Sequence, residues 1–175
     1  MSKEKGFLVV LKSSEQIQHS YNPKYRGLYR TRPFYIEEYE KELNDPYFAG
    51  KYTDDHGLIP NLPFAAQVLA ELVRMDDHAS FEIIYVKDWE GASTLEDSSG
   101  FRFLGFDVAC YSPFWSIVAD SPNPEDPEVR AFLTKLNEYG LFSSGEEAES
   151  YREAYLNLYP NKQELILRIW EVYLV

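Results

Sequence analysis

The chain has 175 residues, of which 45% are hydrophobic and 16% aromatic, and its formal net charge at pH 7 is −12. This apolar content is sufficient for a buried core, which argues against an intrinsically disordered chain despite the net charge. No apolar run approaches the roughly 20 residues of a membrane span, and the short run near the N-terminus is too brief for a signal peptide. We therefore expect a single globular domain over residues 1–175, located in the cytoplasm.

The charge is distributed unevenly along the chain. Residues 1–32 hold seven Lys or Arg against two Glu, a net charge of +5, whereas residues 33–175 have a net charge of −17. Such an excess of carboxylates repels phosphate backbones and anionic membranes, and it attracts cationic partners over about a Debye length, ~8–10 Å. The composition therefore disfavours nucleic acid and membranes as partners and favours a basic protein.

The first third of the chain predicts few regular elements. Residues 7–12 form an apolar run rich in β-branched residues, which is typical of a buried strand. Residues 13–60 contain four prolines and three glycines, so only one short helix, at about residues 35–43, is predicted among them. Half of the 14 tyrosines also lie before residue 53, and so many rings must pack on the domain itself or on a partner.

The middle of the chain predicts a helix followed by three strands. Asn61 is a typical N-cap residue, and apolar residues at helical spacing follow it over residues 62–75. The run at 80–87 predicts a strand. The runs at 101–109 and 114–119 predict two further strands joined by a turn, and three strands adjacent in sequence favour an antiparallel sheet.

The last third predicts two helices and a strand. Asp126 and Pro127 are a typical cap and first-turn pair, and Gly140 supplies a left-handed stop for an apolar stripe that reaches Leu136. Ser144 and Glu147 form a capping-box pattern, which predicts a second helix over residues 145–159. Residues 164–175 are dense in β-branched and aromatic residues and predict a strand, with a closing helix as the alternative.

This order of elements does not alternate strictly between strands and helices. It predicts an α+β fold, in which helices pack on one face of a mostly antiparallel sheet.

Two Asp-Asp-His tripeptides suggest a possible metal site. Asp54 and His56 belong to the first tripeptide, and Asp76 and His78 belong to the second. Carboxylate and imidazole groups are suitable ligands for divalent metals, and a metal-dependent hydrolase needs several of them to converge. Neighbouring residues in loops usually point in different directions, however, so solvated turn residues are the favoured interpretation. We expect no cofactor.

A basic and aromatic run occupies residues 21–32, where Arg26 and Arg30 interleave with Tyr25 and Tyr29. This composition is typical of a patch that binds single-stranded nucleic acid, but the charge of the remaining residues opposes that interpretation. The cations can instead lie against the protein's own acidic surface. Because arginine and tyrosine are also enriched in binding hot spots, we expect these four residues to contribute to a protein interface.

Acidic clusters lie at Glu37 and Glu38, at residues 125–128, and at Glu146 and Glu147. Carboxylates at a helix N-terminus complement its dipole, so helix stability and solubility account for each cluster taken alone. Taken together, they could present negative charge to a basic groove, as an inhibitor of a nuclease does.

Catalytic signatures are scarce in this chain. The single cysteine, Cys110, has no histidine near it in sequence and is interpreted as a small buried hydrophobic residue. Glycine-rich phosphate loops, CxxC pairs and HExxH or GxSxG motifs do not occur. The sequence therefore predicts a non-enzymatic domain that binds a basic protein, most specifically a toxin-neutralising (immunity-type) or inhibitor protein. The alternatives are a metal-dependent hydrolase or a structural subunit of a larger assembly.

Overall fold

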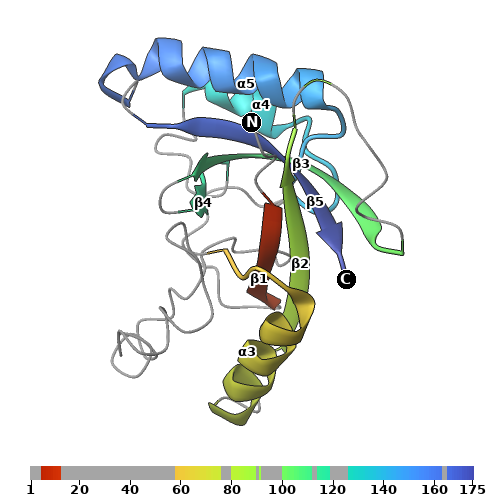
Figure 1. Ribbon diagram of the computed structural model, residues 1–175. Helices are drawn as coiled ribbons and strands as arrows, with labels where there is room; N and C mark the ends of the chain where they lie inside the picture. Colours follow the sequence, from red (N-terminus) through yellow and green to blue (C-terminus); the bar gives the residue numbers. More distant parts are fainter. Residues whose placement is uncertain are drawn as a thin grey trace.

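The computed structural model describes residues 5–12, 58–75, 80–89, 91, 100–111, 114–118, 126–162 and 165–175. Within these residues five strands form one sheet: β1 (Lys5–Lys12), β2 (Ser80–Asp88), β3 (Arg102–Tyr111), β4 (Phe114–Ser116) and β5 (Leu167–Leu174). Three α-helices, α3 (Leu62–Met75), α4 (Pro127–Leu133) and α5 (Gly145–Leu158), and the 3₁₀-helix η3 (Pro160–Lys162) complete the described elements (Figure 1).

The strands lie in the order β1-β2-β5-β3-β4, and every neighbouring pair is antiparallel. The C-terminal strand β5 therefore lies between β2 and β3, which follow each other in sequence but do not pair. The pairing of β3 with β4 confirms the predicted connection between these two strands. The predicted strands at residues 7–12, 80–87 and 164–175 are also confirmed, with bounds that differ by a few residues.

The helices cover the same face of the sheet, which we call face A. Because side chains alternate along a strand, the register places Tyr85 of β2, Tyr173 of β5 and Phe106 of β3 on this face. α3 packs on β1 and β2, whereas α5, with α4 beside it, packs on β3 and β5 (Figure 1). The predicted α+β fold, with helices on one face of the sheet, is confirmed.

The opposite face of the sheet, face B, is also apolar. Leu8, Ile84, Trp170 and Val172 lie there, and each is at most 1% exposed. The central strands therefore bury side chains on both faces. This explains why β5 reads as a nearly continuous apolar run rather than as an alternating one.

A short bridge pairs with the outer edge of β1. Phe7 and Ile59 exchange two backbone hydrogen bonds, of 2.8 and 2.9 Å. Leu58 packs on the neighbouring Gly6, where an ideal Cβ would lie 2.8 Å from the Cβ of Leu58. Residue 6 must therefore lack a side chain for the bridge to form.

The same arrangement recurs on β3. Phe106 and Phe142 exchange two backbone hydrogen bonds of 2.9 Å, and an ideal Cβ on Gly105 would lie 2.8 Å from the Cβ of Leu141. Gly105 has a φ of +146° and lies at a register shift in the pairing with β5. The shift is a β-bulge, and because of it Phe103 and Phe106 both face the helices.

Helix α4 ends earlier than predicted, at a turn that precedes the Phe106–Phe142 bridge. We predicted a helix from Pro127 up to Gly140, but α4 ends at Leu133. Leu136 remains buried, as its spacing predicted, but the side chain of Asn137 bonds to the backbone around it. Its amide donates to the carbonyl of Leu104 (2.8 Å), and its Oδ1 accepts from the backbone N–H groups of residues 139 and 141. These bonds hold a turn in place of further helix.

The strand predicted at residues 114–119 is also shorter than expected. β4 ends at Ser116, and Ile117 and Val118 form a turn. Both of these successive side chains are buried in the same core cluster, at 0% and 2% exposure. An extended strand would place them on opposite faces, so burial of both requires the chain to leave the strand.

Candidate binding surface

The acidic helix α5 begins at a well-defined cap. Ser144 has extended backbone angles, and its Oγ accepts a hydrogen bond of 3.2 Å from the backbone N–H of Glu147. This is the bond predicted from the capping-box pattern. Gly145 follows with its Cα directly against the ring of Trp89, where an ideal Cβ would overlap the indole. The start of α5 is therefore fixed by a local cap and by contact with the end of β2.

Aromatic rings fix the inner face of α5. The ring of Tyr151 lies 5.6 Å from that of Phe132 in α4, and successive ring centroids from Tyr151 to Tyr155 and on to Tyr159 are 6.1 and 5.0 Å apart. Burial raises the pKa of the Tyr155 hydroxyl, and the neighbouring Tyr159 raises it further. Because this face is held by the core, only the outer face of α5 is available to a partner.

The outer face of α5 is polar and acidic. The exposed residues Glu146, Ser150, Glu153 and Asn157 follow one another at intervals of four, three and four positions, which places them on one stripe. The two glutamates are seven positions apart, which corresponds to about 10 Å along the helix axis. Neither carboxylate forms an ion pair with a residue in the described part of the chain. Two unneutralised charges therefore face outwards.

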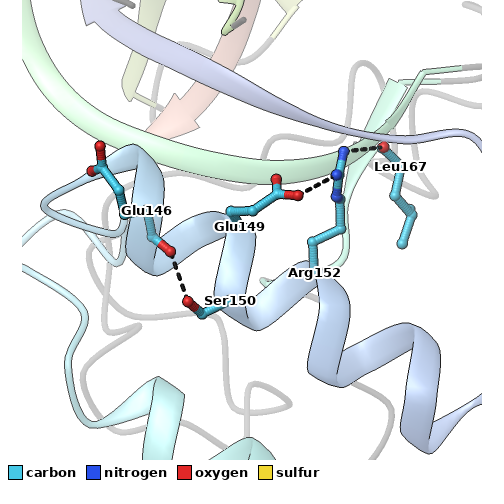
Figure 2. A network of polar contacts seen from close by, with 5 residues as sticks. All are labelled: Glu146, Glu149, Ser150, Arg152 and Leu167. Carbon is cyan, nitrogen blue, oxygen red and sulfur yellow. Dashed lines mark hydrogen bonds and ion pairs between the residues drawn. The ribbon is translucent and has the colours of Figure 1, made fainter. Parts of the chain in front are cut away.

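A second stripe of α5 faces β5 and is neutralised. Arg152 forms an ion pair with Glu149, and its Nη1 also contacts the backbone carbonyl of Leu167 at 3.4 Å. Figure 2 shows Arg152 between these two groups, with the carboxylate of Glu146 away from them. Ser150 donates a hydrogen bond of 2.8 Å to the backbone carbonyl oxygen of Glu146, and not to its side-chain carboxylate. The ion pair with Arg152 therefore offsets the charge of Glu149, whereas the glutamates of the outer stripe keep theirs.

The start of α4 adds acidic residues near the far end of α5. Asp126 caps α4 by accepting a hydrogen bond of 2.9 Å from the backbone N–H of Glu128, whose side chain is exposed. Burial raises the pKa of the Tyr159 hydroxyl, and the charge of Asp126 raises it further. Asp126 therefore lies close to the C-terminal end of α5. We refer to the outer stripe of α5 with Glu146 and Glu153 as the acidic surface, and Asp126 and Glu128 add negative charge near the C-terminal end of this helix.

The central strands bury charged residues that sequence reasoning missed. Lys87 of β2 and Glu171 of β5 lie directly opposite each other in the register on face A, and each is 1% exposed. The hydroxyl of Tyr173 donates a hydrogen bond to Glu171. Opposite charges at opposed cross-strand positions can compensate each other when both are taken out of water. The position of Glu171 in the middle of an apolar strand was the available signal.

Two other polar pairs lie on face B. Ser116 donates a hydrogen bond of 2.7 Å to Asp107, which is 1% exposed. Arg168 of β5 pairs with Asp88 of β2 at 2.8 Å. Within the described residues, no three His, Cys, Asp or Glu side chains come together as a metal site would require. These pairs connect neighbouring strands and thereby position the sheet.

Of the residues predicted to bind a partner, Glu146 and Glu147 lie in the described part of the chain. Both are in the first turn of α5; Glu146 is exposed, and Glu147 is half-buried at the cap. The remaining predicted binding residues, Tyr25, Tyr29, Arg26, Arg30, Glu37 and Glu38, lie outside the described residues, as does the helix expected at 35–43. The proposed metal ligands Asp54, His56, Asp76 and His78 also lie outside them.

Sequence reasoning did not single out Glu153. A lone glutamate within a helix is a common solvated residue; its spacing of seven from Glu146 was the available signal, and the structure adds that both side chains are exposed. No helix in the described ranges is long and apolar enough to cross a membrane. Comparisons with protein-family models, with curated proteins and with solved structures found no match to this chain. A function must therefore be argued from the chemistry of the surface itself.

Proposed function

We propose that this protein acts in the cytoplasm by binding a cationic protein through the acidic surface. The net charge of −12 attracts such a partner from a distance, and the outer stripe of α5 offers carboxylates that it can reach. In its most specific form the proposal is a toxin-neutralising (immunity-type) or inhibitor protein that occupies a basic groove of its target by non-covalent contact.

The observation that carries this proposal is the position of Glu153. It lies in the third turn of α5, beyond the first turn in which a carboxylate gains from the helix dipole. It also follows Glu149 by four positions, a like-charge spacing that destabilises a helix by about 0.2–0.5 kcal/mol. The helix dipole therefore does not favour a carboxylate at position 153, whereas contact with a cationic partner would favour it.

The other acidic residues serve the helices as well. Glu146 and Glu147 lie in the first turn of α5, and Glu128 lies in the first turn of α4. Negative charge at these positions stabilises the helix by about 0.3–1 kcal/mol. Removing them would change stability and binding together, so Glu153 gives the cleaner test.

The test begins by finding the partner with two forms of the protein as bait. Wild type and the Glu146→Gln/Glu153→Gln variant are each used to capture proteins from the producing cells at ~50 mM salt, where screening is weak. We expect wild type to retain a basic protein that the double variant retains poorly. Glu71→Gln serves as the control for loss of a glutamate elsewhere, because residue 71 lies in α3 and outside the acidic surface.

Association kinetics with the captured protein then test the role of charge. We expect the association rate to fall at least tenfold between ~50 and ~500 mM salt, and Glu153→Gln to lower it while leaving the urea midpoint unchanged or higher. A rate that does not change with salt would contradict the proposal. If the partner is a toxin, co-expression of this protein should restore growth of cells that produce it.

A further inference from the structure

The sheet is built from two groups of elements that meet along one pair of strands. β1, β2 and α3 form the first group, and β3, β4, β5, α4 and α5 form the second. Among the described helices and strands, β2 and β5 are the pair in contact across the two groups. Their ladder joins residues 84–88 to residues 170–174, which is shorter than the eight-residue ladder between β1 and β2. The register of this short ladder therefore sets the position of the first group, and of α3 with it, relative to the second.

Opposite charges meet across this ladder on both faces of the sheet. On face A, Lys87 of β2 lies directly opposite Glu171 of β5, and each is 1% exposed. On face B, Asp88 of β2 forms an ion pair of 2.8 Å with Arg168 of β5. Each strand thus carries one cation and one anion, in the reverse arrangement of its neighbour. Because a charge buried away from an opposite charge is costly, these residues restrict how the two strands can align.

A slip by two residues is the smallest change of alignment that keeps every side chain on its own face. In one direction, such a slip would bring Val86 opposite Trp170 instead of Val172. It would also bring Asp88 directly opposite Arg168. The ion pair on face B could therefore form in the slipped alignment as well as in the observed one.

The charged residues on face A do not tolerate this slip. It would place Lys87 opposite Ile169 and Glu171 opposite Tyr85, so each buried charge would lie against an uncharged side chain. We propose that the Lys87–Glu171 pair selects the register at which β5 joins the two groups. Fixing a register is the best-attested use of a polar or charged group within an apolar core. This inference concerns the sheet alone and is independent of the proposed binding of a cationic partner.

Cross-strand contacts between α-protons report the register in solution. The backbone N–H of Trp89 donates to the carbonyl of Ile169 (2.8 Å), and hydrogen-bonded pairs alternate with non-hydrogen-bonded pairs along an antiparallel ladder. Val86 and Val172 therefore form a non-hydrogen-bonded pair, whose α-carbons lie about 4.5 Å apart and whose α-protons give a strong nuclear Overhauser effect. The slipped alignment would replace this signal with one between Val86 and Trp170.

The Lys87→Met/Glu171→Met variant tests the proposal, because methionine fills a similar volume without a charge. We expect the Val86–Val172 signal to lose roughly a tenth or more of its intensity as a second alignment becomes populated. The Val86–Trp170 signal, absent from wild type, should appear. The urea midpoint should stay at or above that of wild type, because an apolar pair replaces a buried ionic one.

Two further variants serve as controls. Lys87→Glu/Glu171→Lys exchanges the charges but keeps them opposed, so it should show the wild-type signal alone. Glu71→Met/Arg74→Met removes the ion pair of α3, outside the ladder, and should also show the wild-type signal alone. A double methionine variant that keeps the single native register, or that fails to fold, would overturn the proposal. So would a slipped alignment in the charge-exchanged variant.

Discussion

The helices α3 and α5 differ in the face that each turns to solvent, although they are built alike in other respects. Both have 14 residues, both pack on face A of the sheet, and both begin after a residue whose side chain caps the helix. They differ in charge: the one glutamate and the one arginine of α3 pair with each other, whereas the outer stripe of α5 carries Glu146 and Glu153. The sheet thus dictates the inner face of each helix and leaves the outer face to be determined by what that helix meets.

The largest expected effect concerns the inner faces, where the two helices should behave alike. Tyr151 of α5 is 1% exposed, and Leu72 of α3 is 3% exposed. Tyr151→Ala should lower the free energy of unfolding by about 3–5 kcal/mol and Leu72→Ala by about 2–5 kcal/mol, because each leaves a cavity. Urea denaturation measures both losses. Loss of less than about 1 kcal/mol at either site would show that its helix is poorly packed on the sheet.

A smaller effect is expected at the two caps. Asn61 accepts a hydrogen bond of 3.0 Å from the backbone N–H of Phe64, and Ser144 accepts one of 3.2 Å from that of Glu147. Asn61→Ala and Ser144→Ala should each destabilise the protein by about 1 kcal/mol. Amide hydrogen exchange should show the added opening in the first turn of the affected helix. Equal opening in both helices after either change would contradict local capping.

The smallest expected effect is that the stability of α5 depends on pH at high pH, whereas the stability of α3 does not. Burial raises the pKa values of Tyr155 and Tyr159, so the folded protein holds these protons more tightly than the unfolded chain. The stability that these protonated tyrosines contribute is fully present below about pH 10. It is lost as the pH rises through their raised pKa values. The inner face of α3 is formed by Ala65, Val68 and Leu72, which do not titrate.

Segment-resolved hydrogen exchange at about pH 8 and pH 10.5 tests this difference. We expect α5 to open more than α3 at the higher pH, and Tyr155→Phe/Tyr159→Phe to remove most of the difference. The hydroxyl of Tyr159 is buried and has no hydrogen-bond partner in the described part of the chain, so Tyr159→Phe alone should not destabilise the protein at neutral pH. A decrease in its urea midpoint would show that this hydroxyl does have a partner.

Local signals predicted the elements well. The bounds of α3 agree with the prediction, and those of α5 differ by one residue, because caps and helical spacing lie within a few residues of each other. The end of α4 was wrong because Asn137 bonds to Leu104, which is 33 residues away in sequence. The order of the strands was not predictable from local patterns, since the place of β5 depends on pairing across most of the chain.

The candidate surface was predictable only in part. The glutamates of the first turn of α5 were found because helix N-termini attract carboxylates, but Glu153 stands out only when the outer stripe is known. Lys87 was missed for a related reason: a lysine at the end of a strand is normally solvated, and its burial follows from packing against elements distant in sequence.

The position of β5 also affects how the protein can form during synthesis. The β1–β2 and β3–β4 pairs can assemble from residues made early, but they have no shared strand until residues 167–174 are available. Until then each pair exposes the edge that β5 later covers, and unpaired edges promote aggregation. The strand that joins the two pairs is therefore synthesised after the residues of both. A chain interrupted before residue 167 should therefore lack the strand that joins the β1–β2 pair to the β3–β4 pair in one sheet.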